Sequence, residues 1–122
     1  MGERVEAFRR LGGQPNRFKE SGNLVFERFA ELYPVAYEEG TLSTKTKELL
    51  ALAISIVRDC EDCITYHLIR LRELEATRDE LYELFALTLV VGGSTVIPTL
   101  RRSAAFVEEL EEDARQGAET QT

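Results

Sequence analysis

Residues 47–67 read KELLALAISIVRDCEDCITYH, and this stretch decides the fold because one helix ends and another begins within it. Its first half is apolar around most of a helix's circumference, which predicts a helix over residues 44–57 that is buried in the domain or against a partner. The pattern breaks at Asp59, a good N-cap for a second helix that runs from Cys60 to about Leu74. A turn this tight makes the two helices roughly antiparallel.

The rest of the chain also shows helical periodicity. Residues 23–34 carry apolar side chains at three- and four-residue steps, and Pro34 ends or kinks that helix. Thr77 followed by Glu80 fits a capping box, and the helix that starts there ends at Gly92-Gly93. A last helix follows directly after the two glycines. No segment alternates polar and apolar residues as a strand does, so the sequence predicts an all-α fold with five to six helices.

The length of 122 residues fits one domain of ordinary size. Residues 1–20 are polar and show only a short helical pattern, so we expect an adaptable N-terminal arm. Residues 21–113 are expected to form the helical domain, and the polar segment 114–122 is expected to be a flexible tail.

The composition argues against several classes of function. A formal net charge of −7 disfavours binding to nucleic acid or anionic lipid, because both depend on clustered Lys and Arg. The pair Arg101-Arg102 fits the solvated face of a helix. No segment has the length of a membrane span or the pattern of a secretory signal, so we expect a cytoplasmic protein that does not bind membranes. In that reducing compartment, two close cysteines are more often catalytic or metal-binding than structural.

Both cysteines and the only histidine of the chain lie within eight residues. On a helix, Cys60, Cys63 and His67 share one face. Glu48 is the only acid of the preceding apolar helix, and the antiparallel arrangement places it at about the height of His67. Glu48 and His67 could then form a proton relay that serves a thiolate. The chemistry that such a group permits is thiol redox, in which a thiolate attacks a peroxide and a second thiol closes a disulfide.

The same residues allow other interpretations. Two cysteines three residues apart can be small buried hydrophobes, and a lone histidine can be a satisfied core residue. A zinc site is also open, with Cys60, Cys63 and His67 as three ligands and Glu48 as a fourth. Glu48 could instead complement the dipole of its own helix, and Tyr66 could serve packing alone. The alternative to an enzyme is therefore a non-enzymatic oligomeric module with a zinc-binding or inert cysteine pair.

The spacing of these four residues resembles one family motif. The motif is Glu, eleven residues, Cys, two residues, Cys, three residues and His, and it is present here at Glu48, Cys60, Cys63 and His67. It is typical of the alkylhydroperoxidase branch of the carboxymuconolactone decarboxylase / AhpD-like family. The run ATRDEL at residues 76–81 and the pair Gly92-Gly93 extend the resemblance, which covers about residues 42–105.

The resemblance implies a fold, an activity and partners. The fold would be the all-α AhpD-like fold, assembled as a homo-oligomer, usually a trimer or a hexamer. The activity would be the reduction of hydroperoxides, with no cofactor and no metal, and a lipoylated or thioredoxin-like protein would restore the dithiol. By position, Cys63 would be the peroxidatic thiol and Cys60 the resolving thiol exposed to the reductant. Glu48 and His67 would form the proton relay.

The chain departs from the family pattern at two positions. Well-studied peroxidase members have a histidine just before the second cysteine, where this chain has Asp62, which implies a poorer relay. The family commonly has a glycine where this chain has Glu75, which implies a different helix end within the same fold. The decarboxylase branch generally lacks the cysteine pair, so lactone decarboxylation is not expected.

Overall fold

The computed structural model of the protein describes residues 2–12 and 16–121, and within these ranges it is all-helical. The predicted all-α fold is therefore confirmed. The described residues form seven α-helices and one 3-10 turn: α1 Glu3–Gly12, α2 Arg17–Glu20, α3 Leu24–Ala36, α4 Thr44–Val57, α5 Glu61–Glu73, α6 Arg78–Gly92, η1 Ser94–Val96 and α7 Ile97–Gln121. The helix beyond the five to six predicted is the four-residue α2.

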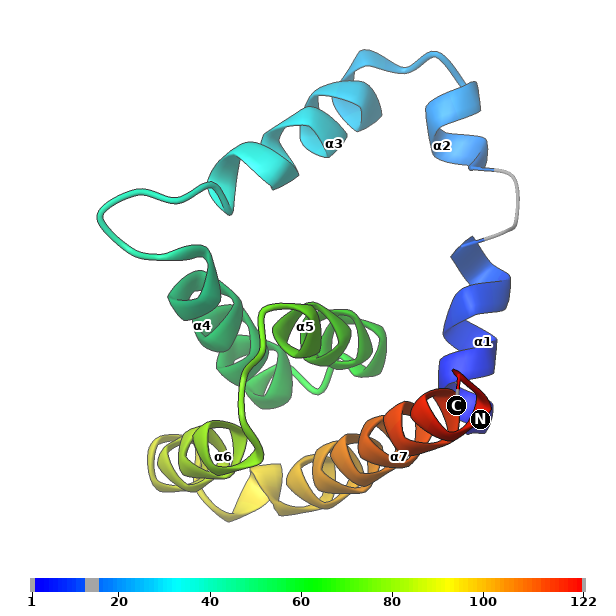
Figure 1. The fold of residues 1–122 in the computed structure, drawn as a ribbon. Coiled ribbons are helices and arrows are strands. Elements are labelled where there is room, and N and C mark those ends of the chain that lie inside the picture. The colour runs from blue at the N-terminus through cyan, green and yellow to red at the C-terminus, as the bar shows by residue number, and fades with distance from the viewer. Residues whose placement is uncertain (1, 13–15, 122) are drawn as a thin grey trace.

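Helices α4 and α5 pack side by side and antiparallel in the middle of the molecule, as predicted, with α6 and α7 along one side of them (Figure 1). The hydrophobic core lies between these four helices and includes Leu52, Ile56, Ile64, Leu68, Leu71, Phe85 and Phe106. Helices α2 and α3 lie outside this bundle, and α1 lies beside the far end of α7 (Figure 1). The bundle therefore fixes the position of α5, which carries the cysteines and the histidine.

The junction between α4 and α5 differs from the prediction by one residue. Asp59 adopts a left-handed conformation with φ of 54°, and the amide of Cys60 donates back to the carbonyl of Ser55 at 3.0 Å. This pattern closes α4, where glycine is the usual residue. Asp59 therefore belongs to the end of α4, and the predicted N-cap is wrong. Cys60 is the N-cap of α5, because it is the first extended residue after the turn and its sulfur accepts from the amide of Cys63 at 3.3 Å.

The other helix ends can be compared with their predictions. The capping box of Thr77 and Glu80 at the start of α6 is confirmed, and α6 ends at Gly92, with Gly93 as its C-cap at φ of 80°. The last helix begins at Ile97, after the 3-10 turn, so that Pro98 falls in its first turn. Glu75 has φ of 61°, so α5 ends in the left-handed conformation that a glycine would adopt. The expectation of a different helix end at Glu75 is therefore wrong.

The terminal segments do not stand apart from the bundle. Val5 of α1 is 2% exposed and belongs to the core, and its amide donates to Glu109 of α7 at 3.3 Å. The backbone of α7 remains helical through residues 114–121. The division into an arm over residues 1–20, a domain over 21–113 and a tail over 114–122 stays a prediction.

Two apolar surfaces are uncovered in the single chain. Helix α3 has no buried residue, and its exposed apolar side chains are Leu24, Val25, Phe26, Phe29, Leu32 and Val35. The second surface joins α4 and α6 and consists of Leu50, Ile54, Val57, Leu87, Val90 and Val91. The sequence predicted that α4 is buried either in the domain or against a partner. Burial in the domain accounts for only one face of this helix. Across residues 2–12 and 16–121, no helix combines the length and apolarity needed to cross a membrane.

Candidate active site

The two cysteines are joined by a disulfide at the start of α5. Cys60 is the N-cap, and Cys63 lies in the first turn of the helix. In the single chain Cys63 is exposed and Cys60 is partly buried, so the sulfur expected to face the reductant is the less exposed of the two. Cys60 is shielded because it directly follows the last turn of α4. The structure thus places the pair at the protein surface, in a bonded state.

Glu48 and His67 form a buried pair between α4 and α5. The Glu48 carboxylate lies 2.6 Å from Nδ1 of His67, and the side chains are 1% and 6% exposed. A carboxylate accepts hydrogen bonds, so Nδ1 carries the proton and Nε2 is the nitrogen that can accept one. The antiparallel packing thus brings together two residues that are nineteen positions apart. Because His67 lies one turn after Cys63, their side chains share a face of α5.

A cavity of about 600 Å³ opens beside Glu48, and three of the eight residues that line it are tyrosines, namely Tyr33, Tyr37 and Tyr66. Tyr66 stacks edge-on against His67, with ring centroids 5.2 Å apart, and Tyr37 lies 6.0 Å from the same ring. Burial raises the pKa of the Tyr66 hydroxyl above its usual value, and the charge of Glu48 raises it further. Burial also raises the pKa of Tyr33, which closes the cavity from α3. These hydroxyls therefore stay protonated at neutral pH.

A basic residue, Arg70, also lines this cavity, one turn beyond Tyr66 on α5. Its Nε lies 3.8 Å from the Glu48 carboxylate, and its guanidinium also pairs with Glu73. The hydrogen bond to Glu73 raises the pKa of Arg70, which therefore carries its charge throughout the neutral range. Sequence reasoning treated Tyr66 as packing and did not single out Arg70. Their positions three and seven residues after Cys63 on one helix were the signal for both.

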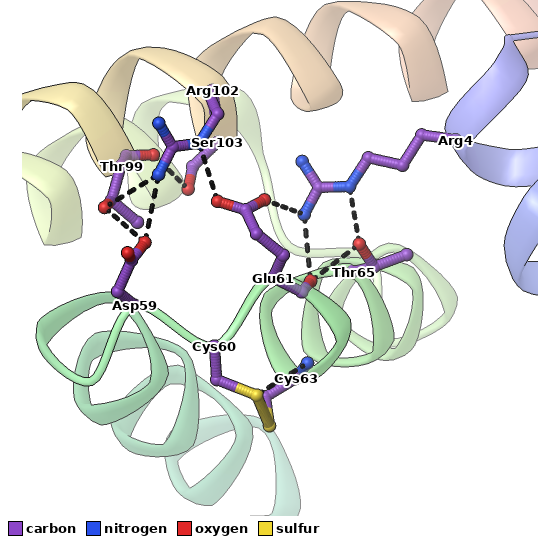
Figure 2. A network of polar contacts seen from close by, with 9 residues as sticks. All are labelled: Arg4, Asp59, Cys60, Glu61, Cys63, Thr65, Thr99, Arg102 and Ser103. Carbon is purple, nitrogen blue, oxygen red and sulfur yellow. Dashed lines mark hydrogen bonds and ion pairs between the residues drawn. A yellow bond between two sulfur atoms is a disulfide. The ribbon is translucent and has the colours of Figure 1, made fainter.

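Charged residues of α1 and α7 contact the start of α5 beside the disulfide (Figure 2). Arg102 of α7 donates from Nη2 to Asp59 at 2.9 Å and from Nε to Glu61 at 2.7 Å. The hydroxyl of Thr99 donates to the same Asp59 oxygen at 2.8 Å. The sequence predicted that Arg102 lies on the solvated face of a helix, and its side chain is indeed 49% exposed. The structure adds that this arginine contacts the residues on both sides of Cys60.

A second arginine approaches from α1 and holds the first turn of α5. Arg4 donates to the Glu61 carbonyl at 3.0 Å and to the Thr65 hydroxyl at 2.5 Å, and it also pairs with the Glu61 carboxylate at 3.1 Å. Its guanidinium lies 4.4 Å from the centre of the Phe106 ring. Burial lowers the pKa of Arg4, and the charge of Glu61 opposes that shift. No signal in the sequence pointed to Arg4, which lies more than fifty residues away along the chain.

The arrangement combines a reversible dithiol, a buried acid–imidazole pair and an aromatic cavity. A dithiol of this kind can accept or donate two electrons by closing and opening the disulfide. Among residues 2–12 and 16–121, no cluster of three or more His, Cys, Asp or Glu side chains is arranged to hold a metal ion. The four predicted site residues lie on α4 and α5 in two bonded pairs, Cys60 with Cys63 and Glu48 with His67.

Comparison with known proteins places this site in a family context. The model of the carboxymuconolactone decarboxylase family matches residues 23–108. One similar crystal structure is that of a carboxymuconolactone decarboxylase family protein from Thermotoga maritima, which is suggested to take part in an antioxidative response. Its sequence is 46% identical, its TM-score is 0.73, and the match covers 78% of this chain and 98% of that one. A second crystal structure from Thermotoga maritima is 43% identical, with a TM-score of 0.80 over 93% and 97% of the two chains.

Two further proteins are more distant. A family member from Legionella pneumophila, solved in its apo form, has a TM-score of 0.78 at 28% identity and covers 88% of this chain and 96% of that one. A protein of Cupriavidus necator, named only as uncharacterised, is 28% identical over 82 residues, which are 67% of this chain and 73% of the relative. The similarity thus extends over nearly the whole length of the solved structures.

Proposed function

The chain belongs to the carboxymuconolactone decarboxylase family, and we propose that within it the protein is an alkylhydroperoxidase-like thiol peroxidase that works through Cys60 and Cys63. The observation that carries this proposal is the position of the two cysteines, within bonding distance of each other and one turn from the buried Glu48–His67 pair. The suggested antioxidative role of the Thermotoga maritima relative agrees with it. The dithiol favours redox chemistry over the decarboxylation for which the family is named.

The oxidative half of the cycle needs a thiolate, a proton acceptor and a second thiol. His67 takes the proton of the Cys63 thiol, and Glu48 stabilises the imidazolium that forms. The thiolate attacks the terminal peroxide oxygen, so that an S–O bond forms and the O–O bond breaks. The leaving alkoxide takes the proton from His67 and departs as an alcohol. The thiol of Cys60 then attacks the sulfenic acid of Cys63, which closes the disulfide and releases water.

The reductive half restores the dithiol from outside. A dithiol reductant attacks the disulfide and gives up two electrons and two protons, and it becomes a disulfide itself. We propose a lipoylated or thioredoxin-like protein in this role. The exposed position of Cys63 supports this step, because an incoming thiolate needs access to a sulfur of the pair. The aromatic cavity beside Glu48 supports an organic hydroperoxide as the substrate, since tyrosine rings offer apolar surface to its carbon chain.

We also propose that the protein acts as a homo-oligomer, a trimer or a hexamer. The apolar surface of α3 and the surface shared by α4 and α6 support this proposal. Together they expose twelve large apolar side chains, namely Leu24, Val25, Phe26, Phe29, Leu32, Val35, Leu50, Ile54, Val57, Leu87, Val90 and Val91. Contiguous apolar surface of this kind is uncommon on monomers and typical of obligate interfaces. Size-exclusion chromatography with light scattering measures the assembly directly.

The experiment that tests the function is peroxide consumption by the purified protein with dihydrolipoamide as reductant. We expect continuous turnover by the wild type and none by Cys63→Ser. The Cys60→Ser variant should consume about one equivalent of peroxide and then stop, because its sulfenic acid has no resolving thiol. Thiol titration before and after peroxide should show the loss of two thiols per chain in the wild type alone.

Two other results would contradict the proposed peroxidase activity or redirect it. If both thiols of the reduced wild type survive an excess of peroxide, the proposal fails. Stoichiometric zinc that remains bound to the reduced protein through dialysis would support the zinc-binding module instead, because zinc prefers thiolate and imidazole ligands.

A further inference from the structure

The residues on both sides of Cys60 are tied to α7 by one guanidinium. Arg102 reaches Asp59 through Nη2 and Glu61 through Nε, and the two distances are 2.9 and 2.7 Å (Figure 2). Asp59 ends α4 and Glu61 begins α5, so the arginine spans the junction at which Cys60 is the central residue. A planar guanidinium with donors in a fixed fork suits such a bridge better than any other side chain.

The bridge is anchored in the core of the protein at its α7 end. Thr99, which is 4% exposed, donates to the same Asp59 oxygen as Arg102 and accepts from Arg102 at 3.2 Å. One turn further, the buried Ser103 donates to the Thr99 carbonyl at 2.8 Å. Asp59 has a left-handed conformation, which costs free energy in a residue other than glycine. The contacts with Thr99 and Arg102 stabilise that conformation. The junction is thus held by α7 and not only by its own backbone.

We propose that Arg102 is a positioning residue that holds Cys60 against Cys63 and so shifts the equilibrium between dithiol and disulfide toward the disulfide. The inference rests on the proposed dithiol chemistry. Arg102 contacts neither sulfur, and it acts through Asp59 and Glu61. A junction that is fixed before the sulfurs bond leaves less conformational freedom to lose on bond formation, which favours closure.

A purely electrostatic effect of Arg102 would have the opposite sign. The positive charge favours a thiolate at Cys60, and stabilisation of the reduced form makes a disulfide easier to reduce. Removal of the charge would therefore favour the disulfide, whereas loss of the hydrogen bonds to Asp59 and Glu61 favours the dithiol. The direction of the change in Arg102→Ala thus separates the two explanations.

The test is the equilibrium of the full-length protein with mixtures of dihydrolipoamide and lipoamide at pH 7, without peroxide. Dihydrolipoamide gives two electrons and two protons to the Cys60–Cys63 disulfide and becomes the cyclic disulfide. The fraction of reduced protein is read by thiol alkylation and mass spectrometry. We expect Arg102→Ala to move the equilibrium constant about three- to tenfold toward the dithiol, as a lost orienting contact of this strength would.

Two further variants complete the design. Arg102→Lys keeps the charge but loses the fork, and we expect a smaller shift in the same direction. Arg101→Ala removes a charge from the adjacent position, which is exposed on the same helix, and we expect no shift. The Arg102 side chain is 49% exposed, so its truncation leaves no buried cavity, and thermal unfolding of the oxidised variants verifies that each is folded.

The inference is overturned by either of two results. In the first, Arg102→Ala matches Arg101→Ala. In the second, Arg102→Ala moves toward the disulfide while Arg102→Lys matches the wild type, which would assign the effect to charge alone. Because no peroxide is present, this experiment is separate from the test of peroxidase activity, and failure of one leaves the result of the other intact.

Discussion

The residues that flank the two ends of helix α5, Asp59 and Glu75, share a left-handed backbone conformation. Their side chains have different surroundings. Asp59 ends the preceding helix with φ of 54°, and Glu75 follows α5 with φ of 61°. In each case the next amide donates back to the helix just closed, at 3.0 and 2.9 Å. Both positions favour glycine and neither has it.

The difference lies in what each carboxylate contacts. The Asp59 side chain accepts from Thr99 and Arg102 of α7. Glu75 is exposed, and its carboxylate makes no hydrogen bond or ion pair within residues 2–12 and 16–121. A left-handed residue other than glycine costs free energy, and at Asp59 the contacts with Thr99 and Arg102 offset that cost. At Glu75 nothing in the described structure offsets it.

The largest effect on stability is expected between the two ends of α5, from a substitution of Glu48, the partner of His67. We expect Glu48→Ala to lower the free energy of unfolding by about 3 kcal/mol, because it leaves a buried imidazole without its partner. Urea denaturation at pH 7 measures this. Glu48→Gln is the matched control, since it keeps the volume and an acceptor for Nδ1, and we expect a loss of about 1 kcal/mol. Equal losses in the two variants would mean that the hydrogen bond contributes little.

The comparison of the two ends can be tested directly with glycine. We expect Glu75→Gly to raise the free energy of unfolding by about 0.5 kcal/mol, because relief of the left-handed strain exceeds the entropy that glycine adds to the unfolded chain. Asp59→Gly should lower it by about 1 kcal/mol, because it removes the acceptor for Thr99 and Arg102. Thermal and urea unfolding of both variants in the oxidised state give the two values. Changes of the same sign at both positions would contradict the assigned role of Asp59.

The smallest effect on stability is expected just beyond Glu75, from a substitution in the capping box that starts α6. The amide of Thr77 donates to Glu80 and lowers the pKa of that carboxyl, and Lys45 lowers it further at 2.9 Å. Because the folded-state pKa is below the unfolded value, the stabilisation is complete above the unfolded pKa of about 4.5 and is lost as the pH falls through the folded pKa.

A neutral variant tests that pH dependence. Glu80→Gln should destabilise the protein at pH 7 and have less effect at pH 3, as measured by urea unfolding at the two values. Glu83→Gln on the same helix is the control for loss of a charge. An equal loss from Glu80→Gln at both pH values would rule out a contribution from the ionised carboxylate.

Much of the fold was predictable because its signals are local. The apolar run of residues 44–57, the capping box at Thr77 and the glycines at the end of α6 each act within a few residues. The height of Glu48 opposite His67 also followed, since two helices joined by a short turn fix each other's register. The errors at Asp59 and Glu75 have one cause. Neither residue is glycine, so the residue type at these positions did not indicate a left-handed helix end.

The sequence by itself determined the all-helical fold, the family motif and the side chains able to carry thiol chemistry. Only the tertiary structure decided which arginines contact the residues next to the disulfide. Arg4 and Arg102 lie 57 and 41 residues from Glu61 along the chain, and on their own helices they look like ordinary solvated cations. Their role depends on how α1 and α7 pack against α5, which is set by burial of the whole core and not by any pattern within those helices.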